Sequence, residues 1–379
     1  MNLRTAEQRK IPLLDLKAQH RTIRDQVLAA LTRVTESQQF ILGEEVSALE
    51  AEIAAYCGAK YAIGCGSGSD ALLLALMALG IGPGDQVLTT PYTFFATVSA
   101  ISRVGAAPVF ADVKPDTFNL DPDHASRVLS ANPKVRAMIP VHLFGACADM
   151  DSIQALARPK GISIVEDAAQ ALGAEYKRRR AGTIGDLGCL SFFPSKNLGA
   201  FGDAGMLITD DGALAERLMA LRVHGAHKKY RHEWVGINSR LDAIQAAVLR
   251  VKLPYLDFWT ERRRQNADLY RRFISDLDIP VHAPQANTYQ TRHIYNQFVI
   301  RAERRNELRA YLNAQEIGTE IYYPVPMHLQ KCFAGLGYKA GDFPVSERLA
   351  NESLALPIYP ELQLDDIEYI CRTVKAFYS

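Results

Sequence analysis

The sequence predicts an α/β protein in which a mostly parallel sheet lies between helices and a smaller α+β domain follows. Three observations support this fold class. Between residues 60 and 167, short apolar runs alternate with stretches of helical periodicity, which is typical of parallel strands joined by helices that cover both faces of a sheet. Polar and glycine residues gather where these runs end. Beyond about residue 210 the pattern becomes helical.

Two amphipathic helices are expected before the sheet. Apolar residues recur at helical spacing from Leu14 to about Ser37 and again from Glu44 to Tyr56, and Gly43 stands in the break between them. The predicted strands are 60–65, 86–90, 107–112, 135–142 and 162–167, and the predicted helices between them are 68–80, 94–104, 121–130 and 149–158.

The polar clusters stand at the predicted carboxyl ends of these strands. They cover residues 64–69, 89–93, 142–145 and 166–170. Ligands of open α/β sheets bind outside this edge, so we expect the clusters to meet at one site.

The chain is expected to divide near residue 256. A long connecting helix is predicted over 241–256, with an interruption near Pro254, and the last part mixes helices with short strands. We therefore predict a large domain over residues 1–256, which includes the N-terminal helices, and a small α+β domain over 257–379.

The charge balance argues against a nucleic-acid or membrane partner. The 379 residues hold 43 lysines and arginines against 42 aspartates and glutamates, so no global basic field exists to attract a polyanion. The densest basic run, Arg178–Arg180, is better explained as the solvated tip of a hairpin. No run of eighteen apolar residues is present, so no membrane span is expected.

The cysteines and the N-terminal stretch favour the cytoplasm. The six cysteines are scattered without a CxxC pair, which argues against a zinc site or a disulfide framework and for a reducing compartment. No apolar run of signal-peptide length opens the sequence. We expect a cytoplasmic protein without a metal.

A glycine- and serine-rich turn follows the first predicted strand. The stretch GSGSD at 66–70 leads into the apolar helix ALLLALMALG, and amide groups at such a helix start can hold a phosphate. The alternative is a tight turn in which Ser67 or Ser69 caps the helix.

Two adjacent acids, Glu166 and Asp167, close the last predicted strand of this series. Alternation along a strand points them to opposite faces, so one can be structural and the other functional. A buried carboxylate needs a cation or several donors. The alternative is that Asp167 only caps the following helix.

Lys196 stands alone in SFFPSKNLGAFGDAG, among aromatic and small residues. Desolvation lowers the pKa of such an ammonium and makes it an amine nucleophile. The alternative is a lysine whose stem packs on an aromatic ring while its head is solvated. Taken together, a phosphate cradle, a strand-end acid and an amine are the parts that hold pyridoxal 5′-phosphate. Phe94 is placed to stack on the ring, or else to be an ordinary core residue.

Ordered motifs along nearly the whole chain resemble the DegT/DnrJ/EryC1/StrS family of pyridoxal-phosphate-dependent nucleotide-sugar aminotransferases, which have fold type I. They include IPLLDLKAQ, GSGSDALLLAL, PVHLFGACADMD, VEDAAQALGAEYKRRRAGTIGD, SFFPSKNLGAFGDAG, GINSRLDAIQAAVLRVKL and YYPVPMHLQ. The resemblance implies a large domain with a sheet of the seven-stranded type and a smaller C-terminal domain.

The resemblance also implies a role for particular residues. Lys196 would form the Schiff base and shuttle protons, and Asp167 would pair with the pyridinium nitrogen, which leaves Glu166 structural. The remaining cofactor contacts would come from Gln170, Phe94, Gly68, Ser69, Ser191 and, from the other subunit, Asn238. Contacts to the sugar nucleotide would come from Arg240, Tyr322, Tyr323 and His328.

The activity implied is transfer of an amino group from L-glutamate to a nucleotide-linked keto sugar by a ping-pong Schiff-base mechanism, in a homodimer with shared active sites. The form PSKNLGAFGD looks more like members that act at a 3-keto carbon, such as that of a dTDP-3-keto-6-deoxyhexose. The alternatives are a 4-keto or UDP-linked keto sugar, or a non-catalytic regulatory homologue. Tyr322 stands where relatives usually have histidine, and GDAG replaces the commoner GDGG.

Overall fold

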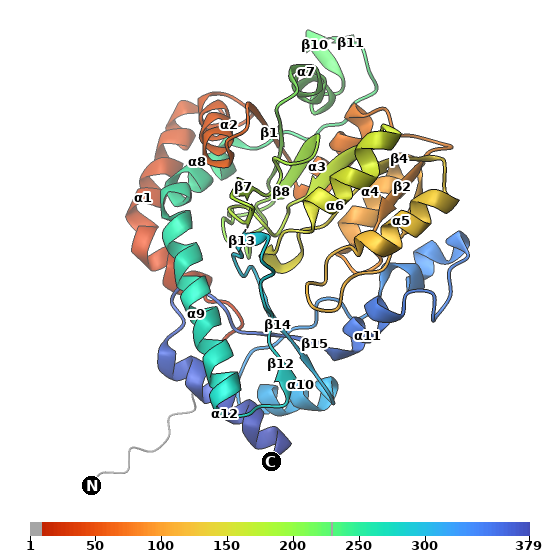
Figure 1. The fold of residues 1–379 in the computed structure, drawn as a ribbon. Coiled ribbons are helices and arrows are strands. Elements are labelled where there is room, and N and C mark those ends of the chain that lie inside the picture. The colour runs from red at the N-terminus through yellow and green to blue at the C-terminus, as the bar shows by residue number, and fades with distance from the viewer. Residues whose placement is uncertain (1–9, 229) are drawn as a thin grey trace.

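A seven-stranded sheet forms the centre of the large α/β part of the molecule (Figure 1). The computed structural model describes residues 10–228 and 230–379. The strand order is β1-β9-β8-β5-β4-β2-β3, and only β9 runs antiparallel to its neighbours. The strands are β1 (Tyr61–Cys65), β2 (Gln86–Thr89), β3 (Ala107–Phe110), β4 (Val135–Met138), β5 (Ser163–Asp167), β8 (Leu187–Ser191) and β9 (Gly205–Thr209).

This arrangement confirms the predicted fold class. The five predicted strands are present, although β4 ends at Met138 and the prediction reached residue 142. Strands β8 and β9 were not predicted individually, although they flank the loop that carries Lys196. Their short sequences, LGCLS and GMLIT, both contain glycine, which weakens a strand pattern.

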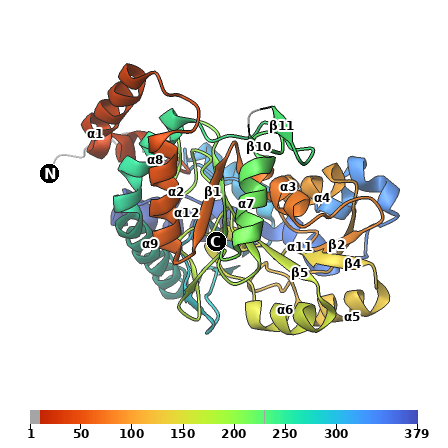
Figure 2. The same cartoon turned by 90° about the horizontal axis from the view of Figure 1, so that it is seen from above.

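Helices cover both faces of the sheet, as the view from above shows (Figure 2). One apolar cluster joins the sheet to α3 (Gly68–Ala78), α4 (Phe95–Arg103) and α7 (Gly212–Leu221). A second joins the other face to α2 (Glu44–Cys57), α5 (Pro122–Ala131), α6 (Met150–Ala157) and α8 (Ala243–Lys252). Several of these helices begin at a side-chain cap from Ser67, Asp121, Asp149 or Asp211.

The predicted connecting helix is two helices. Helix α8 ends at Lys252, the 3₁₀ turn η3 (Leu253–Tyr255) follows, and α9 (Leu256–Asp276) begins directly after it. Pro254 lacks the amide hydrogen that an unbroken helix would use, which explains the break. The first predicted helix is α1 (Leu16–Ser37), and it packs on α8.

A smaller antiparallel sheet, β12-β14-β15, lies in the C-terminal part. Its strands are β12 (Val281–His282), β14 (Phe298–Ala302) and β15 (Ser353–Leu356), and the helices there are α10 (Arg305–Ala314), α11 (Pro344–Glu352) and α12 (Leu364–Tyr378). Ile11 pairs with Ile317 and belongs to the apolar cluster of this part. The domain boundary at residue 256 stays a prediction.

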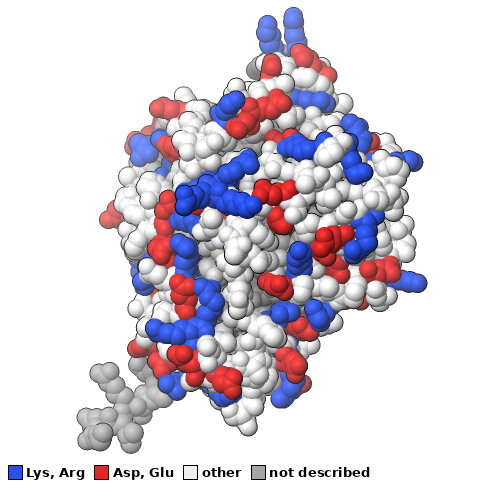
Figure 3. All heavy atoms as spheres, viewed as in Figure 1, with Lys and Arg blue, Asp and Glu red and all other residues white. Residues whose placement is uncertain are grey.

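The basic run forms part of a hairpin, as predicted. Strands β6 (Glu175–Tyr176) and β7 (Arg179–Arg180) pair, with Lys177 and Arg178 at the turn, and β13 (Gln290–Arg292) adds a third strand. Positive and negative side chains are interspersed over the face seen in Figure 3. No helix among the described residues combines the length and apolar character needed to cross a membrane.

Candidate active site

A cavity of about 440 Å³ opens where the predicted polar clusters meet, at the carboxyl ends of the central strands. Asp167 ends β5, Ser191 ends β8, and the turn at Ser67 follows β1. Of the predicted site residues, the cavity wall contains Gly68, Ser69, Phe94, Asp167, Gln170, Ser191, Lys196, Tyr322 and Tyr323.

Lys196 lies in a loop that closes on itself between β8 and β9. Its amide donates to the carbonyl of Phe193 (2.8 Å), and the amide of Ala200 donates to the carbonyl of Phe192 (2.8 Å). Desolvation lowers the pKa of the Lys196 ammonium to about 8, although the nearby carboxylate of Asp167 acts in the opposite direction. The lysine therefore offers an uncharged amine at mildly alkaline pH.

Asp167 is buried, with both carboxylate oxygens hydrogen-bonded. Thr97 Oγ1 donates to Oδ2 at 2.7 Å and the amide of Ala169 donates to Oδ1 at 3.2 Å. Burial raises the pKa of this carboxyl, while these hydrogen bonds and the Lys196 ammonium oppose the rise. Because burial still raises the pKa of Asp167 despite these donors, a cation brought into the cavity would further stabilise the charged carboxylate.

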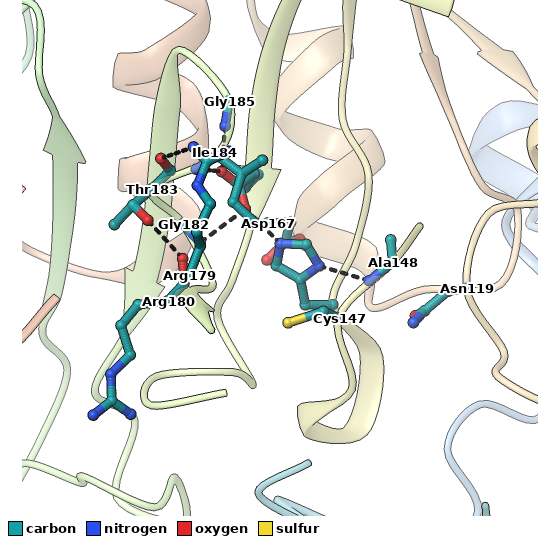
Figure 4. A network of polar contacts seen from close by, with 12 residues as sticks. Asn119, Cys147, Ala148, Asp167, Arg179, Arg180, Gly182, Thr183, Ile184 and Gly185 are labelled. Atoms are coloured by element: carbon teal, nitrogen blue, oxygen red, sulfur yellow. Dashed lines mark hydrogen bonds and ion pairs between the residues drawn. The ribbon is translucent and has the colours of Figure 1, made fainter. Parts of the chain in front are cut away.

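Glu166 does not line the cavity and belongs to a buried network, of which Gly182, Ile184 and Gly185 are labelled in Figure 4. Its carboxylate accepts from the amides of Gly182, Ile184 and Gly185 and from Nε2 of His142 (2.8 Å). Burial acts to raise the pKa of Glu166, but the imidazole and the amide donors outweigh burial and the pKa is lowered.

The tautomer of His142 follows from its other contact. Nδ1 accepts from the amide of Ala148 (3.0 Å), so Nε2 carries the hydrogen that is donated to Glu166. The backbone amide of His142 also donates to the carbonyl of Asp167 (3.0 Å). The network therefore fixes the strand end that carries Asp167.

The side chain of Gln170 is oriented by a hydrogen bond from the backbone of Phe144. The amide of Phe144 donates to Oε1 (2.7 Å), which turns Nε2 toward the hydroxyl of Tyr323 (3.1 Å). Both residues line the cavity. Gln170 is thus held as a donor toward an oxygen acceptor in the cavity.

The turn at Ser67 confirms the capping alternative, and its phosphate contact stays a prediction. Ser67 caps α3 by accepting from the amide of Asp70 (3.1 Å), while Gly68 and Ser69 line the cavity. A Cβ on Gly68 would lie 2.6 Å from Cβ of Ser191, and one on Gly205 would lie 2.3 Å from the backbone of Ser67. The two glycines bring the helix start close to β8 and β9.

Three predicted site residues do not line this cavity in their own chain. Asn238 is exposed and pairs with Val223 through the backbone, and Arg240 lies two residues further on. His328 is buried, and its Nε2 contacts Glu347 Oε1 at 3.0 Å. Their roles stay predictions.

Other residues in the cavity wall or directly behind it were not predicted as site residues. Thr97 holds Asp167, and Asp203 and Gln297 belong to the wall. Thr97 lies in the first turn of α4, and its hydroxyl contacts that of Thr93, which precedes the helix, at 2.9 Å. Nothing in the local sequence marks Gln297.

The donor set of the cavity fits pyridoxal phosphate. Four kinds of group surround the cavity. They are an amine with a lowered pKa, a buried carboxylate suited to a protonated ring nitrogen, an amide donor suited to the phenolic oxygen and a helix start suited to the phosphate. The fold and the cavity define a fold-type I pyridoxal-phosphate enzyme.

The chain belongs to the DegT/DnrJ/EryC1/StrS aminotransferase family, whose sequence model matches residues 21–375. It is a sugar aminotransferase, and its cofactor is pyridoxal phosphate. The predicted family is therefore confirmed.

Curated relatives match along almost their whole length. A Geobacillus stearothermophilus protein named pleiotropic regulatory protein is 48% identical over 97% of this chain and 98% of its own. The dTDP-3-amino-3,4,6-trideoxy-alpha-D-glucose transaminase of Streptomyces venezuelae is 45% identical over 94% and 93%. The UDP-N-acetyl-3-dehydro-alpha-D-glucosamine 3-aminotransferase of Acidithiobacillus ferrooxidans is 42% identical over 96% and 97%.

Solved structures agree with this family. DesV of S. venezuelae in complex with a ketimine intermediate superposes with a TM-score of 0.93 at 43% identity, covering 97% of this chain and 98% of its own. NtdA of Bacillus subtilis with the bound cofactor PMP has a TM-score of 0.86 at 29% identity, covering 96% and 83%.

Proposed function

We propose that this aminotransferase moves the amino group of L-glutamate to the 3-keto carbon of a nucleotide-linked sugar, with a dTDP-3-keto-6-deoxyhexose as the preferred acceptor. The observation that carries the chemistry is the presence of Lys196 and Asp167 on the wall of one cavity. The position of the keto group is supported by relatives named for 3-amino or 3-dehydro sugars at 42–45% identity.

Each of the main cavity residues has a separate role in the proposed reaction. When bound, pyridoxal phosphate supplies a reactive carbonyl and an electron-accepting ring. Lys196 would supply an uncharged Nζ to the cofactor and would afterwards take up and return a proton. The Asp167 carboxylate, held by Thr97, would keep a proton on the ring nitrogen. Gln170, whose Oε1 accepts from the amide of Phe144, would donate from Nε2 to the phenolic oxygen, and the start of α3 would hold the phosphate.

The nucleotide base has a second candidate. The relative from A. ferrooxidans is named for a UDP-linked sugar, and its identity to this chain is close to that of the relative named for a dTDP-linked sugar. A UDP-linked 3-keto sugar is therefore the alternative acceptor, and a 4-keto sugar is a further one.

The test is a comparison of acceptors. The protein is loaded with pyridoxal phosphate and incubated with glutamate and, separately, with dTDP- and UDP-linked 3-keto and 4-keto sugars, and products are read by mass spectrometry. We expect amination of the dTDP-linked 3-keto sugar and none with Lys196→Ala. Amination of the 4-keto sugar alone would refute the proposed position of attack.

A regulatory role without catalysis is disfavoured by the intact cavity, although one relative is named a regulatory protein. If Lys196→Ala kept the cellular role of the protein, the regulatory alternative would hold.

We further propose that the protein is a cytoplasmic homodimer. Phe94, Phe193 and Phe201 are 55%, 52% and 45% exposed near the cavity and its lysine loop. Such a group of exposed aromatic side chains favours contact with another protein surface. A second copy would cover these rings and bring its own Asn238 and Arg240 toward the cavity.

A further inference from the structure

Lys252, the last residue of α8, is a buried cation outside the cavity. It is 4% exposed, and its Nζ donates to the carbonyl of Gly199 at 2.6 Å. The same Nζ lies 4.8 Å from the centre of the Phe201 ring. Among residues 10–228 and 230–379, no carboxylate forms an ion pair with it.

Stability alone does not explain a lysine at this position. Burial lowers the pKa of Lys252 to about 8, which measures how poorly the ammonium is compensated. An apolar side chain of similar length would fill the space without the cost of desolvating a charge. What the lysine adds is a directed, charge-assisted hydrogen bond to one carbonyl.

That carbonyl belongs to the loop that carries the reactive amine. Phe192 and Ala200 close the loop through their backbone hydrogen bond, and Lys196 lies within it. Gly199 stands beside the closure, packed so tightly that a Cβ there would lie 2.3 Å from the carbonyl oxygen of Pro194. A contact to Gly199 therefore fixes the base of the loop.

A second side chain of α8 holds the same segment. Gln245 Oε1 accepts from the amide of Phe201 at 2.8 Å. Gln245 and Lys252 lie seven residues apart, two turns along one face of the helix. Helix α8 in turn packs on α1 and α2, so the loop is tied to a rigid part of the molecule.

We propose that Lys252 is a positioning residue that, with Gln245, holds the Gly199–Phe201 backbone and thereby the amine of Lys196 in the cavity. The link to catalysis depends on the function proposed above. The effect on the loop does not. Small displacements of a reacting group lower the rate far more than they lower binding.

The first experiment measures the loop without the cofactor. Hydrogen exchange of the cofactor-free protein is followed by mass spectrometry for peptides that cover residues 192–203. In Lys252→Met we expect the amides of Ala200 and Phe201 to exchange about tenfold faster. The matched control is Lys375→Met, because Lys375 on α12 also donates to a backbone carbonyl, that of Asp278 at 2.8 Å.

The second experiment measures the amine. Lys252→Met should lower kcat by about 10- to 100-fold with little change in KM, and Lys252→Arg, which keeps a cation and a donor, should recover most of the loss. Thermal unfolding of each variant shows whether the fold is intact.

The outcomes separate the two proposals. Unchanged loop exchange in a folded Lys252→Met protein would overturn the positioning role, and so would equal kcat values for the methionine and arginine variants. A wild-type protein that aminates no keto sugar would overturn the proposed function and leave the exchange result standing.

Discussion

The pKa values of Asp167 and Lys196 shift in opposite directions for one physical reason. Burial disfavours the charged form of each, so it raises the pKa of the carboxyl and lowers that of the ammonium. Each group partly restores the charge of the other. The cavity therefore favours two things together. The Asp167 carboxylate favours a positively charged ring beside it, and the lowered pKa of Lys196 favours the uncharged amine.

The capture of pyridoxal phosphate by the cofactor-free protein should depend on pH through Lys196. Below pH 8 the amine is mostly protonated, so the rate should rise with pH and level off above about 8. An ordinary lysine, with a pKa of 10.5, would give a rate that keeps rising. Stopped-flow absorbance measures the rate, and Lys196→Ala is the control. A rate still climbing at pH 10 would contradict the lowered pKa.

The sequence could identify Lys196 and Asp167 because each stands out locally. One is a lone lysine among apolar and small residues, and the other is an acid that closes a buried strand. Thr97 and His142 could not be recognised in the same way. Their importance comes from hydrogen bonds to residues 70 and 24 positions away, and such pairs have no signature within one segment.

At the scale of elements, the closeness of α3 to β8 depends on Gly68. Gly68→Ala should force the helix start away from Ser191, because the new Cβ would lie 2.6 Å from the serine Cβ. We expect a loss of about 1–3 kcal/mol in the free energy of unfolding, together with weaker binding of pyridoxal phosphate. Urea unfolding of the cofactor-free protein and a cofactor titration measure the two effects.

Gly335→Ala is the matched control for this substitution, since nothing lies within 4 Å of its built Cβ. Gly68→Ala combined with Ser191→Gly should recover part of the lost stability, because the double variant removes the clashing Cβ. Equal stability of Gly68→Ala and the control would show that the helix start has room to move.

The boundaries of helices and strands were predictable where the hydrophobic periodicity agrees with capping residues or with helix-breaking residues such as proline. Apolar runs located the parallel strands, and a capping serine or aspartate marked the helix starts. The break between α8 and α9 occurs near the proline that signalled it, but α9 continues to Asp276, beyond the predicted end at residue 256. Helical periodicity alone does not reveal where one helix gives way to another.

At the scale of the whole molecule, the roles predicted for Asn238 and Arg240 require a second copy of the chain. They lie in the motif GINSRLD but do not line the cavity of their own chain. Whether they reach the cavity of another chain depends on how two copies associate, and a single sequence has no pattern that predicts the mode of association. The homodimer is therefore a proposal, supported by the resemblance and by the exposed aromatic residues.

Mixed dimers test whether two chains share each site. Asn238→Ala should weaken cofactor retention in the homodimer, and Lys196→Ala should abolish activity. If the sites are shared, co-expressed subunits carrying one substitution each should regain about one working site per mixed dimer. Activity is measured after separation by two affinity tags, and each homodimer variant is the control. No recovery in a folded mixed dimer would exclude sharing.

The reversed direction of β9 has a consequence for how this scaffold can change. Because β8 and β9 run antiparallel and pair up to Ser191 and Gly205, the segment between them leaves the sheet and returns at the same edge. A change in the length or composition of the segment between β8 and β9 therefore moves no crossover helix and leaves the pairing register of the strands unchanged. The segment that carries the reactive amine can thus change without displacing the strands, provided that its contacts with Lys252 and Gln245 of α8 are kept.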